Sequence, residues 1–598
     1  MNFLGLLERP HFYPGYINGF KQPSGLIKCH VVEFDVQHFI SLYTACECFF
    51  GEHGISFATI QTEEDFIALT GKLLVSMNDL CGIPNFSSYK LECLSDENKI
   101  FHLWVPALNE HIFHQIMSFV MQFIMQHTVP EMVKIKRDLH AELKQLIDTI
   151  RNEMISRELN IHFLSAANQH NIPWCSISLK GIQYGYGSQA RWLSGTMTDE
   201  TSAMAMELVS DKITTSSFLA RAGFPVAMQL IANNEAEAIA HANIIGYPVV
   251  IKPFNHERGE GVYPNLVDEN QVINAFRKVK SLTDYVVMEK HIHGRDYRLI
   301  VLNAKLIWAI ERIPAHITGD GVQSIDSLLQ QHHAKIYSSA VEHLRERGMN
   351  LQAILPLNEK LVVNRIPNVS AGGTPVAVFD QVHADNKQLM ETVARMLRLN
   401  IAGIDFITHD ISQSWRDHGG AIIEVNAKPQ LGLITAAHVY AEILLKSVRN
   451  KGRIPIMVVC CAGDEDSFLQ QLAESHPHKN IGMVKHKTAY LHDQPLNAAS
   501  SAFQSAKALL LNEEVDGLIY CIQDWNDISE HGLPFDAYDQ LFFIDMPTID
   551  ARLLGDLLRA CVGEKVVNVE YRQMFADDEC VFVEKNALVF GVNIQAAV

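Results

Sequence analysis

The sequence predicts a multidomain protein of mixed α+β and α/β class. The chain has 598 residues, and domains of about 150 residues are usual, so its length excludes a single small binding module. Short β-rich runs alternate with helical patterns through the middle of the chain, and further buried runs follow near the C-terminus. Hydrophobic residues make up 48% of the chain and charged residues 20%. This composition is typical of folded domains with real cores and excludes disorder as the main state.

The charge balance excludes two classes of partner. Acidic residues outnumber basic ones by 68 to 49, which gives a formal charge of −19. We expect neither nucleic acid nor membrane as a partner, because this field repels their phosphates, and an anionic ligand needs a local basic site. The 11 cysteines are scattered without CxxC pairs, which favours a reducing, cytoplasmic compartment. The start of the chain lacks a signal-peptide pattern, and apolar runs such as 456–461 are too short to span a bilayer.

Residues 1–160 are predicted to form an N-terminal α/β domain. The run at 28–34 has the pattern of a strand, and the apolar stretch 112–125 that of a buried core helix. A long charged amphipathic helix is predicted over 133–159, where it would connect to the next domain. No catalytic constellation is visible in this segment.

Residues 161–450 are predicted to form the domain that carries the chemistry. Its strand-like runs end in lysine, glycine or acidic residues, which is typical of a domain with functional groups at strand ends. The predicted strands are 247–253, 285–289, 297–302 and 422–425.

The first candidate site lies in the stretch KPFNHERGEGV. A buried strand delivers Lys252, and a loop with Gly259 and Gly261 follows it. Glycines let the backbone approach phosphate oxygens, and a lysine supplies a point charge for them. The Walker pattern GxxxxGK[ST] is absent, so this loop alone does not establish a nucleotide site.

Two acids flank the next turn. Glu289 ends a predicted strand, Asp296 follows seven residues later, and Arg298 projects from the following strand. Such carboxylates can accept hydrogen bonds from an adenine amine or from ribose hydroxyls. A charged hairpin is the alternative interpretation of this segment.

The third constellation indicates a magnesium site. Asp405 follows one apolar run, and Glu424 and Asn426 end another. Two carboxylates and an amide oxygen at neighbouring strand ends suit Mg²⁺, which prefers hard oxygen ligands and is often bound together with nucleotide phosphates. Either acid alone would be read as a solvated strand end.

The order of these groups resembles the ATP-grasp fold, in which two subdomains clamp ATP and activate a carboxylate as an acyl phosphate. The resemblance is closest to the cyanophycin synthetase family, and it covers about 240 residues of the middle domain. It is carried by SGTMTDETS from Ser194, SDK from Ser210, GRDYR from Gly294, RIPAH from Arg312, GDG from Gly319, NVSAGGT from Asn368 and EVNA from Glu424.

The resemblance implies a role for each matching residue. Lys212 and Lys252 would bind the phosphates of ATP, together with Gly259 and Gly261 of the glycine loop. Glu289 and Lys290 would line the edge of the adenine pocket, and Asp296 would contact the ribose. Mg²⁺ would be held by Asp405, Glu424 and Asn426, and the arginines Arg298 and Arg312 would stabilise negative charge on the reacting oxygens. The loop Ser370, Gly372 and Gly373 would hold the carboxylate end of the substrate.

The chain departs from the family pattern on the acceptor side. Arg258 and Glu260 change the charge of the glycine loop, and the pattern EVNAxPG reads here as EVNAKPQ, with Lys428 and Gln430. These positions are where substrate specificity could differ.

Residues 451–598 are predicted to form a degenerate, Rossmann-like, Mur-ligase-like domain with strands at 454–461, 515–521 and 540–544. The sequence GRIPI is retained, but Glu465 stands where the phosphate-loop lysine belongs and Asp466 replaces the hydroxyl that would bind Mg²⁺. An acid in place of that lysine repels a polyphosphate, so we expect this domain to be non-catalytic.

The resemblance implies an ATP-dependent carboxylate–amine ligase with one active site, most like the second type of cyanophycin synthetase. That type joins β-aspartyl-arginine dipeptides to a peptide polymer. The expected cofactors are ATP and Mg²⁺, and the expected assembly is a homo-oligomer. Two alternatives remain open: a ligase for another amino acid or dipeptide, and a non-catalytic nucleotide-binding partner of a complete synthetase.

Overall fold

A computed structural model of the chain forms two compact units. One consists of Met1–Ser194 with Leu444–Val598, and the other of Gly195–Ile443. The three predicted domain ranges stay predictions. The residues described are 4–31, 36–95, 98–129, 132, 138–156, 161–178, 180–254, 261–331, 337, 340–341, 343–345, 348–364, 372–431, 437–461, 466–476, 480–496, 499–523, 526–544, 554–555, 558–561, 572–576 and 579–585.

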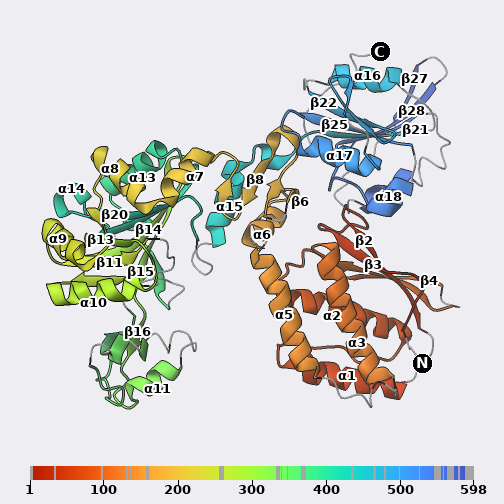
Figure 1. The fold of residues 1–598 in the computed structure, drawn as a ribbon. Coiled ribbons are helices and arrows are strands. Elements are labelled where there is room, and N and C mark those ends of the chain that lie inside the picture. The colour runs from red at the N-terminus through yellow and green to blue at the C-terminus, as the bar shows by residue number, and fades with distance from the viewer. Residues whose placement is uncertain are drawn as a thin grey trace. The chain divides into compact units, whose positions relative to one another are not determined.

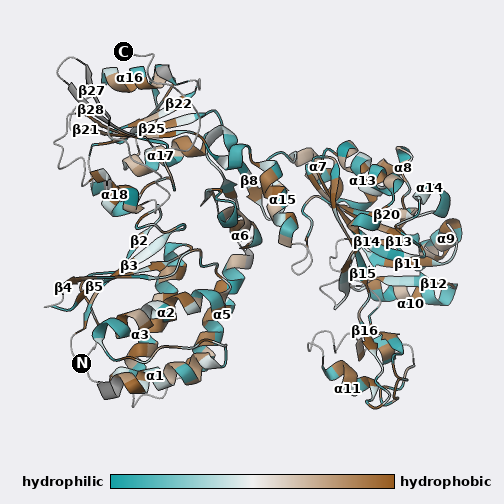
Figure 2. Ribbon diagram, turned by 180° about the vertical axis from the view of Figure 1, so that it is seen from behind, coloured by the Kyte–Doolittle hydropathy of each residue, from teal (hydrophilic) through white to brown (hydrophobic). Residues whose placement is uncertain are grey.

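The N-terminal part of the first unit packs helices beside an antiparallel sheet (Figure 1). Its strands follow the order β1-β3-β5-β4, with β2 paired to β3. The core between the layers includes the fully buried Phe39, Phe66 and Phe123. Figure 2 shows brown and teal bands on α2 and α3, the pattern of amphipathic helices. The elements are β1 (Leu4–Leu6), β2 (His11–Tyr13), β3 (Ser24–Val31), α1 (Val36–Gly51), α2 (Glu63–Cys81), β4 (Lys90–Ser95), β5 (Ile100–Pro106), α3 (Glu110–Thr128) and α5 (Leu139–Ser156).

The sequence predictions for this part hold with shifted ends. The buried helix predicted at 112–125 is confirmed as α3. The predicted strand 28–34 corresponds to the end of β3, and residues 32–35 lie outside the described residues. The long helix predicted from 133 is present as α5, which begins at Leu139. The caps of α2 are explained by its sequence, because Thr62 and Asp65 form a capping box and Gly82 ends the helix with a left-handed backbone.

A short antiparallel ribbon leads from this part toward the end of the first unit. Helix α6 (Ile161–Gln169) precedes the ribbon. The paired strands are β6 (Trp174–Ser176), β7 (Ile182–Tyr184) and β8 (Arg191–Ser194), and the turn η1 (Gly187–Gln189) lies between β7 and β8. The buried Gln183 amide donates to the carbonyl of Leu510 at 2.7 Å, which ties the ribbon to helix α17 (Ala502–Leu511) of the C-terminal part.

The second unit contains two antiparallel sheets. The smaller follows the order β10-β13-β11-β12 and packs helices α9 and α10 against its buried valines and alanines. The larger follows the order β18-β15-β14-β19-β20, with α8 and α13 in contact with its strands. The elements are β9 (Met197–Thr198), α7 (Ala203–Ser210), α8 (Lys212–Arg221), β10 (Gln229–Ala232), α9 (Glu235–Ile245), β11 (Val249–Pro253), β12 (Tyr263–Leu266), α10 (Glu269–Lys280), β13 (Val286–Lys290), β14 (Arg295–Leu302), β15 (Lys305–Ile313), β18 (Thr374–Ala377), η3 (Phe379–Gln381), α13 (Ala384–Met396), β19 (Ile401–Thr408), α14 (Trp415–His418), β20 (Ala421–Asn426) and α15 (Ala437–Ser447).

A small lobe with its own core is inserted between β15 and β18. It pairs β16 (His316–Thr318) with β17 (Lys360–Val362) and carries helix α11 (Ile325–Gln330). The buried Ile325, Leu329 and Leu344 form the centre of this core.

The C-terminal part of the first unit is an α/β sheet in the order β24-β23-β22-β25-β21-β26-β28-β27. Its middle strands are parallel, and the fully buried β21 and β25 lie at the centre. The elements are η4 (Asn450–Gly452), β21 (Ile456–Cys461), α16 (Asp466–Ser475), β22 (Ile481–Lys485), β23 (Thr488–Leu491), β24 (Gln494–Pro495), α17 (Ala502–Leu511), β25 (Gly517–Ile522), α18 (Asn526–His531), β26 (Gln540–Ile544), β27 (Arg572–Ala576) and β28 (Glu579–Lys585).

The predicted class is confirmed, since antiparallel α+β sheets and a parallel α/β sheet occur in one chain. The predicted strands correspond to β11, β13, β14, β20, β21, β25 and β26, with ends shifted by a few residues at most. Among the helices in the described part of the chain, none combines the length and hydrophobicity that crossing a membrane would require.

Candidate active site

The predicted magnesium ligands and catalytic arginines lie on one face of the larger sheet. In its register, Arg312 stands opposite Asp296, and Asp405 stands between Arg298 and Glu424 on its two neighbouring strands. Residues directly opposite on antiparallel strands point to the same face. Side chains two positions apart also share a face, so Asp296 joins Arg298 and Asn426 joins Glu424. The sheet therefore brings together residues that span well over a hundred positions in the sequence.

A network of ion pairs connects four of these side chains. Arg298 donates to both oxygens of Asp405, with its Nη2 at 3.2 Å from Oδ2. Arg312 Nη2 donates to the same Oδ2 at 3.0 Å. The Nε of Arg312 donates to Asp296 Oδ1 at 2.6 Å. The arginines and carboxylates thus alternate across strands β14, β15 and β19.

Burial and neighbouring charges act in opposite directions on these acids. Burial alone would raise the pKa of Asp405, but the charges and hydrogen bonds of Arg298 and Arg312 hold that pKa below its usual value. Burial raises the pKa of Asp296 to about 6, against the opposing charge of Arg312 and with a further contribution from Asp405. For Arg312, burial would lower the pKa, but the two carboxylates beside it raise it above its usual value. Arg312 therefore remains a charged donor.

Lys212 approaches this face from helix α8. Its neighbour Asp211 is the N-cap of the helix and accepts hydrogen bonds from the amides of Ile213 and Thr214 at 3.0 and 3.1 Å. The Nζ of Lys212 lies 3.4 Å from Oε1 of Glu424 on β20. The helix cap thus fixes the point from which this lysine reaches the predicted metal ligand.

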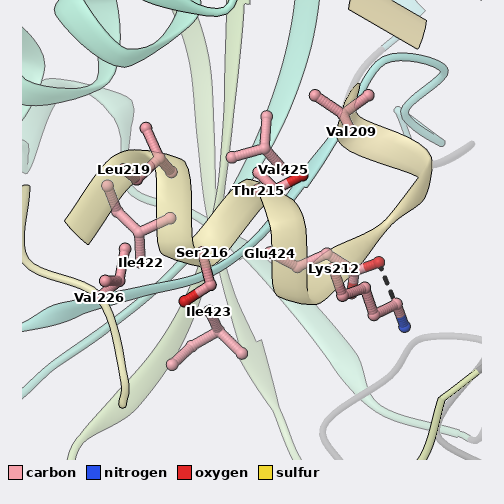
Figure 3. Close-up of a pocket in the computed structure, with 10 residues that line it drawn as sticks. All are labelled: Val209, Lys212, Thr215, Ser216, Leu219, Val226, Ile422, Ile423, Glu424 and Val425. Carbon is pink, nitrogen blue, oxygen red and sulfur yellow. Dashed lines mark ion pairs between the residues drawn. The ribbon is translucent and has the colours of Figure 1, made fainter. Parts of the chain in front are cut away.

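A small pocket lies between α8 and β20. Figure 3 shows Lys212 and Glu424 reaching toward one another at one end, and the apolar side chains of Leu219, Val226 and Ile422 at the other. The full lining is Val209, Lys212, Thr215, Ser216, Leu219, Val226, Ile422, Ile423, Glu424 and Val425.

A second cluster of predicted residues lies on the smaller sheet. Lys252 on β11 and Glu289 on β13 form an ion pair with 2.6 Å between Nζ and Oε2, and both side chains are nearly buried. The amide of Gln229 on β10 donates to the same Oε2 at 2.8 Å. Sequence reasoning missed Gln229, because only the pairing of β10 with β13 places it opposite Glu289.

Lys290 lies on the other face of this sheet, because it follows Glu289 directly in strand β13. Its Nζ donates to the carbonyls of Gly246 and Tyr247 at 2.8 and 3.0 Å, where helix α9 ends. A cation at this position satisfies carbonyls that have no partner within the helix and interacts favourably with the negative end of its dipole. The structure therefore separates the Lys290 side chain from the pair formed by Lys252 and Glu289.

The glycine loops are described only in part. Gly259 and Ser370 lie outside the described residues. Gly261 and Gly372 have left-handed backbones, with φ of +73° and +90°, and this region favours glycine. Gly373 follows directly and leads into strand β18.

The oxygen donors on the site face fit the preference of Mg²⁺. Within the described residues, no group of three or more His, Cys, Asp and Glu side chains is placed to hold a metal ion. The predicted set of Asp405, Glu424 and Asn426 consists instead of two carboxylates and one amide, which is the hard-oxygen chemistry that Mg²⁺ takes. Oδ2 of Asp405 accepts from both arginines, whereas Oδ1 accepts from Arg298 alone and so retains a lone pair for a cation.

Another contact at the site was missed from the sequence. Thr196 donates from Oγ1 to the carbonyl of Pro429 at 2.7 Å. A side chain at Gly403 would collide with the ring of Pro429. The segment after Asn426 therefore folds back over the site face, and Gly403 is the residue that makes room for it. A glycine within an apolar strand pattern is the sequence signal for such a close approach.

Of the two residues on which the predicted loss of the phosphate loop rests, the described part of the chain includes Asp466. Glu465 lies outside the described residues. Asp466 begins helix α16 and forms an ion pair with the buried amine of Lys485. Asp536 accepts a hydrogen bond from Arg453, with 3.0 Å between Oδ1 and Nη1. The carboxylate of Asp536 is thus engaged in an ion pair with Arg453.

Sequence comparison identifies relatives of the chain. The cyanophycin synthetase of Synechocystis sp. is 28% identical over 484 residues, which are 74% of this chain and 55% of that protein. The cyanophycin synthetase of Trichormus variabilis is 28% identical over 485 residues, or 74% of this chain and 53% of the relative. The chain is similar to the cyanophycin synthetases. The resemblance predicted from the motifs is confirmed, and the chain spans about half the length of these curated relatives.

Other comparisons are more distant than those with the cyanophycin synthetases. The glutathione biosynthesis bifunctional protein of Mannheimia succiniciproducens is 27% identical over 269 residues, or 40% of this chain and 34% of that protein. Among solved structures, a bifunctional glutathione synthetase from Pasteurella multocida is 19% identical with a TM-score of 0.37, covering 57% of this chain and 52% of the other. The ATP-grasp ligase PsnB is 14% identical with a TM-score of 0.25, covering 42% and 60%. No family model matches the chain.

Proposed function

We propose that the chain is an ATP-dependent carboxylate–amine ligase of the ATP-grasp type. It activates a carboxylate as an acyl phosphate and joins β-aspartyl-arginine dipeptides to a cyanophycin-like polymer. The observation that carries the proposal is the face of the larger sheet that collects Arg298, Arg312, Asp405 and Glu424, in a chain related to cyanophycin synthetases. The single-site, second-type organisation, the cytoplasmic location and the homo-oligomeric state belong to the same proposal.

ATP would lie between the two sheets of the second unit. Lys212 and Lys252 supply positive charge for its phosphates, together with the backbone at Gly259 and Gly261. Glu289 would accept a hydrogen bond from the adenine amine. Lys290 would act on the adenine side through the backbone that it holds at the end of α9, because its Nζ is bonded to carbonyl oxygens there.

Asp405, Glu424 and Asn426 would hold Mg²⁺. The ion would neutralise charge on the transferring phosphoryl group when bound. The ion pair of Lys212 with Glu424 has to loosen when nucleotide arrives, because the amine and the carboxylate then serve different oxygens.

The reaction has two steps. The γ-phosphoryl group moves from ATP to the substrate carboxylate, which yields ADP and an acyl phosphate. The amine of the second substrate then attacks the acyl carbon, and phosphate leaves as the amide bond forms. Negative charge gathers on oxygen in both steps, and Arg298 and Arg312 are pre-oriented donors that would stabilise it.

The loop with Ser370, Gly372 and Gly373 would hold the carboxylate end of the substrate. Backbone amides next to a glycine in the left-handed region can point together at an anion, and Gly372 has this conformation. The polymer acceptor would approach from the same side.

The test is release of ADP with β-Asp-Arg and ATP, with and without a cyanophycin primer. We expect primer-dependent release by the wild type and a loss of about a hundredfold or more in Lys252→Ala. Lys280→Ala is the matched control, because Lys280 lies on α10 of the same unit and donates to the carbonyl of Asp284. No turnover by the wild type, or equal turnover by Lys252→Ala, overturns the proposal.

A second candidate is a ligase for another dipeptide or amino acid. Lys428 favours it, because its chain packs against Gly195 and burial lowers the pKa of its ammonium group. It also precedes Pro429, which lies over the site face. ADP release across a panel of amino acids and dipeptides separates this candidate from the first. Tight ATP binding without turnover on any of them would instead indicate a non-catalytic nucleotide-binding partner.

A further inference from the structure

Asp296 stands at the end of the row of alternating charges on the site face. Arg298 is bonded to Asp405, and Arg312 is bonded to Asp405 and to Asp296. Arg312 therefore lies between two carboxylates, with Nη2 at 3.0 Å from Asp405 Oδ2 and Nε at 2.6 Å from Asp296 Oδ1. A guanidinium held by acids on both sides has little freedom to rotate.

The sheet fixes this arrangement. Asp296 on β14 and Arg312 on β15 are directly opposite in the register. Their side chains are only 20% and 13% exposed, so solvent screens the pair weakly. An arginine fork that is pre-oriented in this way loses less rotamer freedom when it stabilises a developing charge than one that must first be ordered.

The charge balance makes Asp296 necessary for the geometry. Arg298 and Arg312 share the carboxylate of Asp405. Without Asp296, two positive guanidiniums would compete for one acid at close range, and like charges this close repel each other. The second acid balances the group and gives Arg312 a partner of its own.

We propose that Asp296 is a positioning residue that holds Arg312 in the orientation needed for catalysis. This inference rests on the proposed function and goes beyond it. The role implied by the family resemblance was contact with the ribose of ATP. The Nε and Nη2 atoms of Arg312 both approach Oδ1 of Asp296, and a carboxylate turned toward ribose would release that arginine.

The first test separates catalysis from nucleotide binding. Asp296→Asn keeps the shape of the side chain and removes its charge. We expect kcat to fall by about a hundredfold, as for a displaced catalytic group, while KM for ATP changes by less than about threefold. A large rise in KM for ATP with kcat retained overturns the proposal.

The second test uses 2′-deoxy-ATP and 3′-deoxy-ATP as probes of ribose contact. If Asp296 positions Arg312, the ratio of kcat/KM between ATP and each analogue is the same in the wild type and in Asp296→Asn. If Asp296 binds the ribose, the wild type discriminates against the analogues and the variant loses that discrimination, because the missing hydroxyl no longer leaves an acceptor unpaired. The latter result overturns the proposal.

The third test is a double-mutant cycle with Arg312→Lys. A residue that acts only through Arg312 adds little once the guanidinium fork is gone, so Asp296→Asn should change kcat by less than about threefold in that background. Additive losses overturn the proposal. Asp296→Glu should recover part of the activity of Asp296→Asn, since it restores the charge.

Glu311→Gln is the matched control. Glu311 lies next to Arg312 on β15 but on the opposite face of the sheet, where its carboxylate is 3.6 Å from Arg295 of β14. The control removes an acid–arginine pair from the same two strands, and we expect near wild-type kcat. An equal loss in Glu311→Gln assigns the effect to disturbed strand pairing and overturns the proposal.

These experiments distinguish failure of the proposed ligase function from failure of the positioning role of Asp296. Absence of ADP release by the wild type overturns the proposed ligase function, whereas wild-type turnover with a ribose-type response in Asp296→Asn overturns the positioning role alone. If Asp296→Asn does not fold, as judged by its circular dichroism spectrum, Asp296→Glu takes its place in the analogue test. A displaced carboxylate should lower kcat and leave the analogue ratio unchanged.

Discussion

The Nζ of Lys252 lies 2.6 Å from the Oε2 of Glu289, and the two side chains are 11% and 7% exposed. The pair joins β11 and β13 beneath the proposed nucleotide site. Removing one partner of a buried pair leaves an uncompensated charge. We expect Glu289→Gln to destabilise the second unit by about 3 kcal/mol, measured by thermal unfolding at pH 7.

Glu235→Gln is the control for that variant. Glu235 also pairs with a basic residue, Arg277, but both side chains are largely exposed. Exposed pairs are screened by water and contribute little, so the unfolding midpoint should hardly move. A similar shift in both variants would contradict the importance of burial for the pair of Lys252 and Glu289.

A change at Glu424 should raise the requirement for metal. Glu424→Gln removes a charged oxygen from the proposed ligand set, and a neutral ligand binds Mg²⁺ more weakly. ADP release titrated with MgCl₂ should therefore reach half its maximum at a concentration about tenfold higher than in the wild type. The exposed Glu359→Gln in the inserted lobe should leave the titration unchanged, and an unchanged titration in Glu424→Gln would argue against Glu424 as a ligand.

Asp536 should matter for stability although it has no proposed role in catalysis. It binds Arg453 through Oδ1 at 3.0 Å and also accepts a hydrogen bond from the hydroxyl of the buried Tyr186. Loss of the acid leaves Arg453 without its counter-charge, so Asp536→Asn should lower the free energy of unfolding by about 3 kcal/mol. Urea denaturation measures this change in the free energy of unfolding. Glu514→Gln, at an exposed position, is the control and should leave the free energy unchanged. Unchanged stability would show that the contact contributes little.

The capping box of helix α2 predicts a pH-dependent contribution to stability. Burial slightly raises the pKa of Asp65, but hydrogen bonds from the amides of Gln61 and Thr62 and from the Thr62 side chain lower it overall. An acid with a lowered pKa stabilises the fold above its unfolded pKa of 3.8, and this contribution is lost as pH falls below that value.

Asp65→Asn should therefore be less stable than the wild type at pH 7, by about 0.5 kcal/mol. The difference should shrink as pH approaches 3. Thermal unfolding of both proteins across this range measures it, and Glu64→Gln in the same helical turn is the control. A difference that stays constant with pH would contradict the assignment.

The site residues could be predicted from local patterns, because each lies in a short segment whose residue types indicate its chemistry. Asp405 follows the apolar run 399–404, and Glu424 and Asn426 alternate at the end of another run. The predicted strand end is wrong for Asp405, because β19 continues past it to Thr408 and pairs with β14 and β20 on both sides. The alternation of a strand puts Glu424 and Asn426 on one face whatever the rest of the fold does. Their proximity to Asp405 was an expectation, and it depends on the pairing of β19 with β20.

Contacts between distant segments were beyond sequence reasoning. Nothing near Gln229 in the sequence points to Glu289, and nothing near Lys290 shows that its amine serves the end of α9. Both follow from strand order in the smaller sheet, which local periodicity does not specify. The observed ends of strands and helices differ from the predicted ends for a similar reason, because tertiary packing and helix caps together determine where an element stops.

The sequence by itself determined the class of the fold, the positions of most central strands and the set of residues that carry charge in the proposed site. Side-chain periodicity and residue chemistry are local properties, so they can be read in order along the chain. Only the tertiary structure decided how those charges are paired. Asp296 faces Arg312 because β14 and β15 adopt one register, and a shift of that register by one residue would turn the carboxylate to the other face.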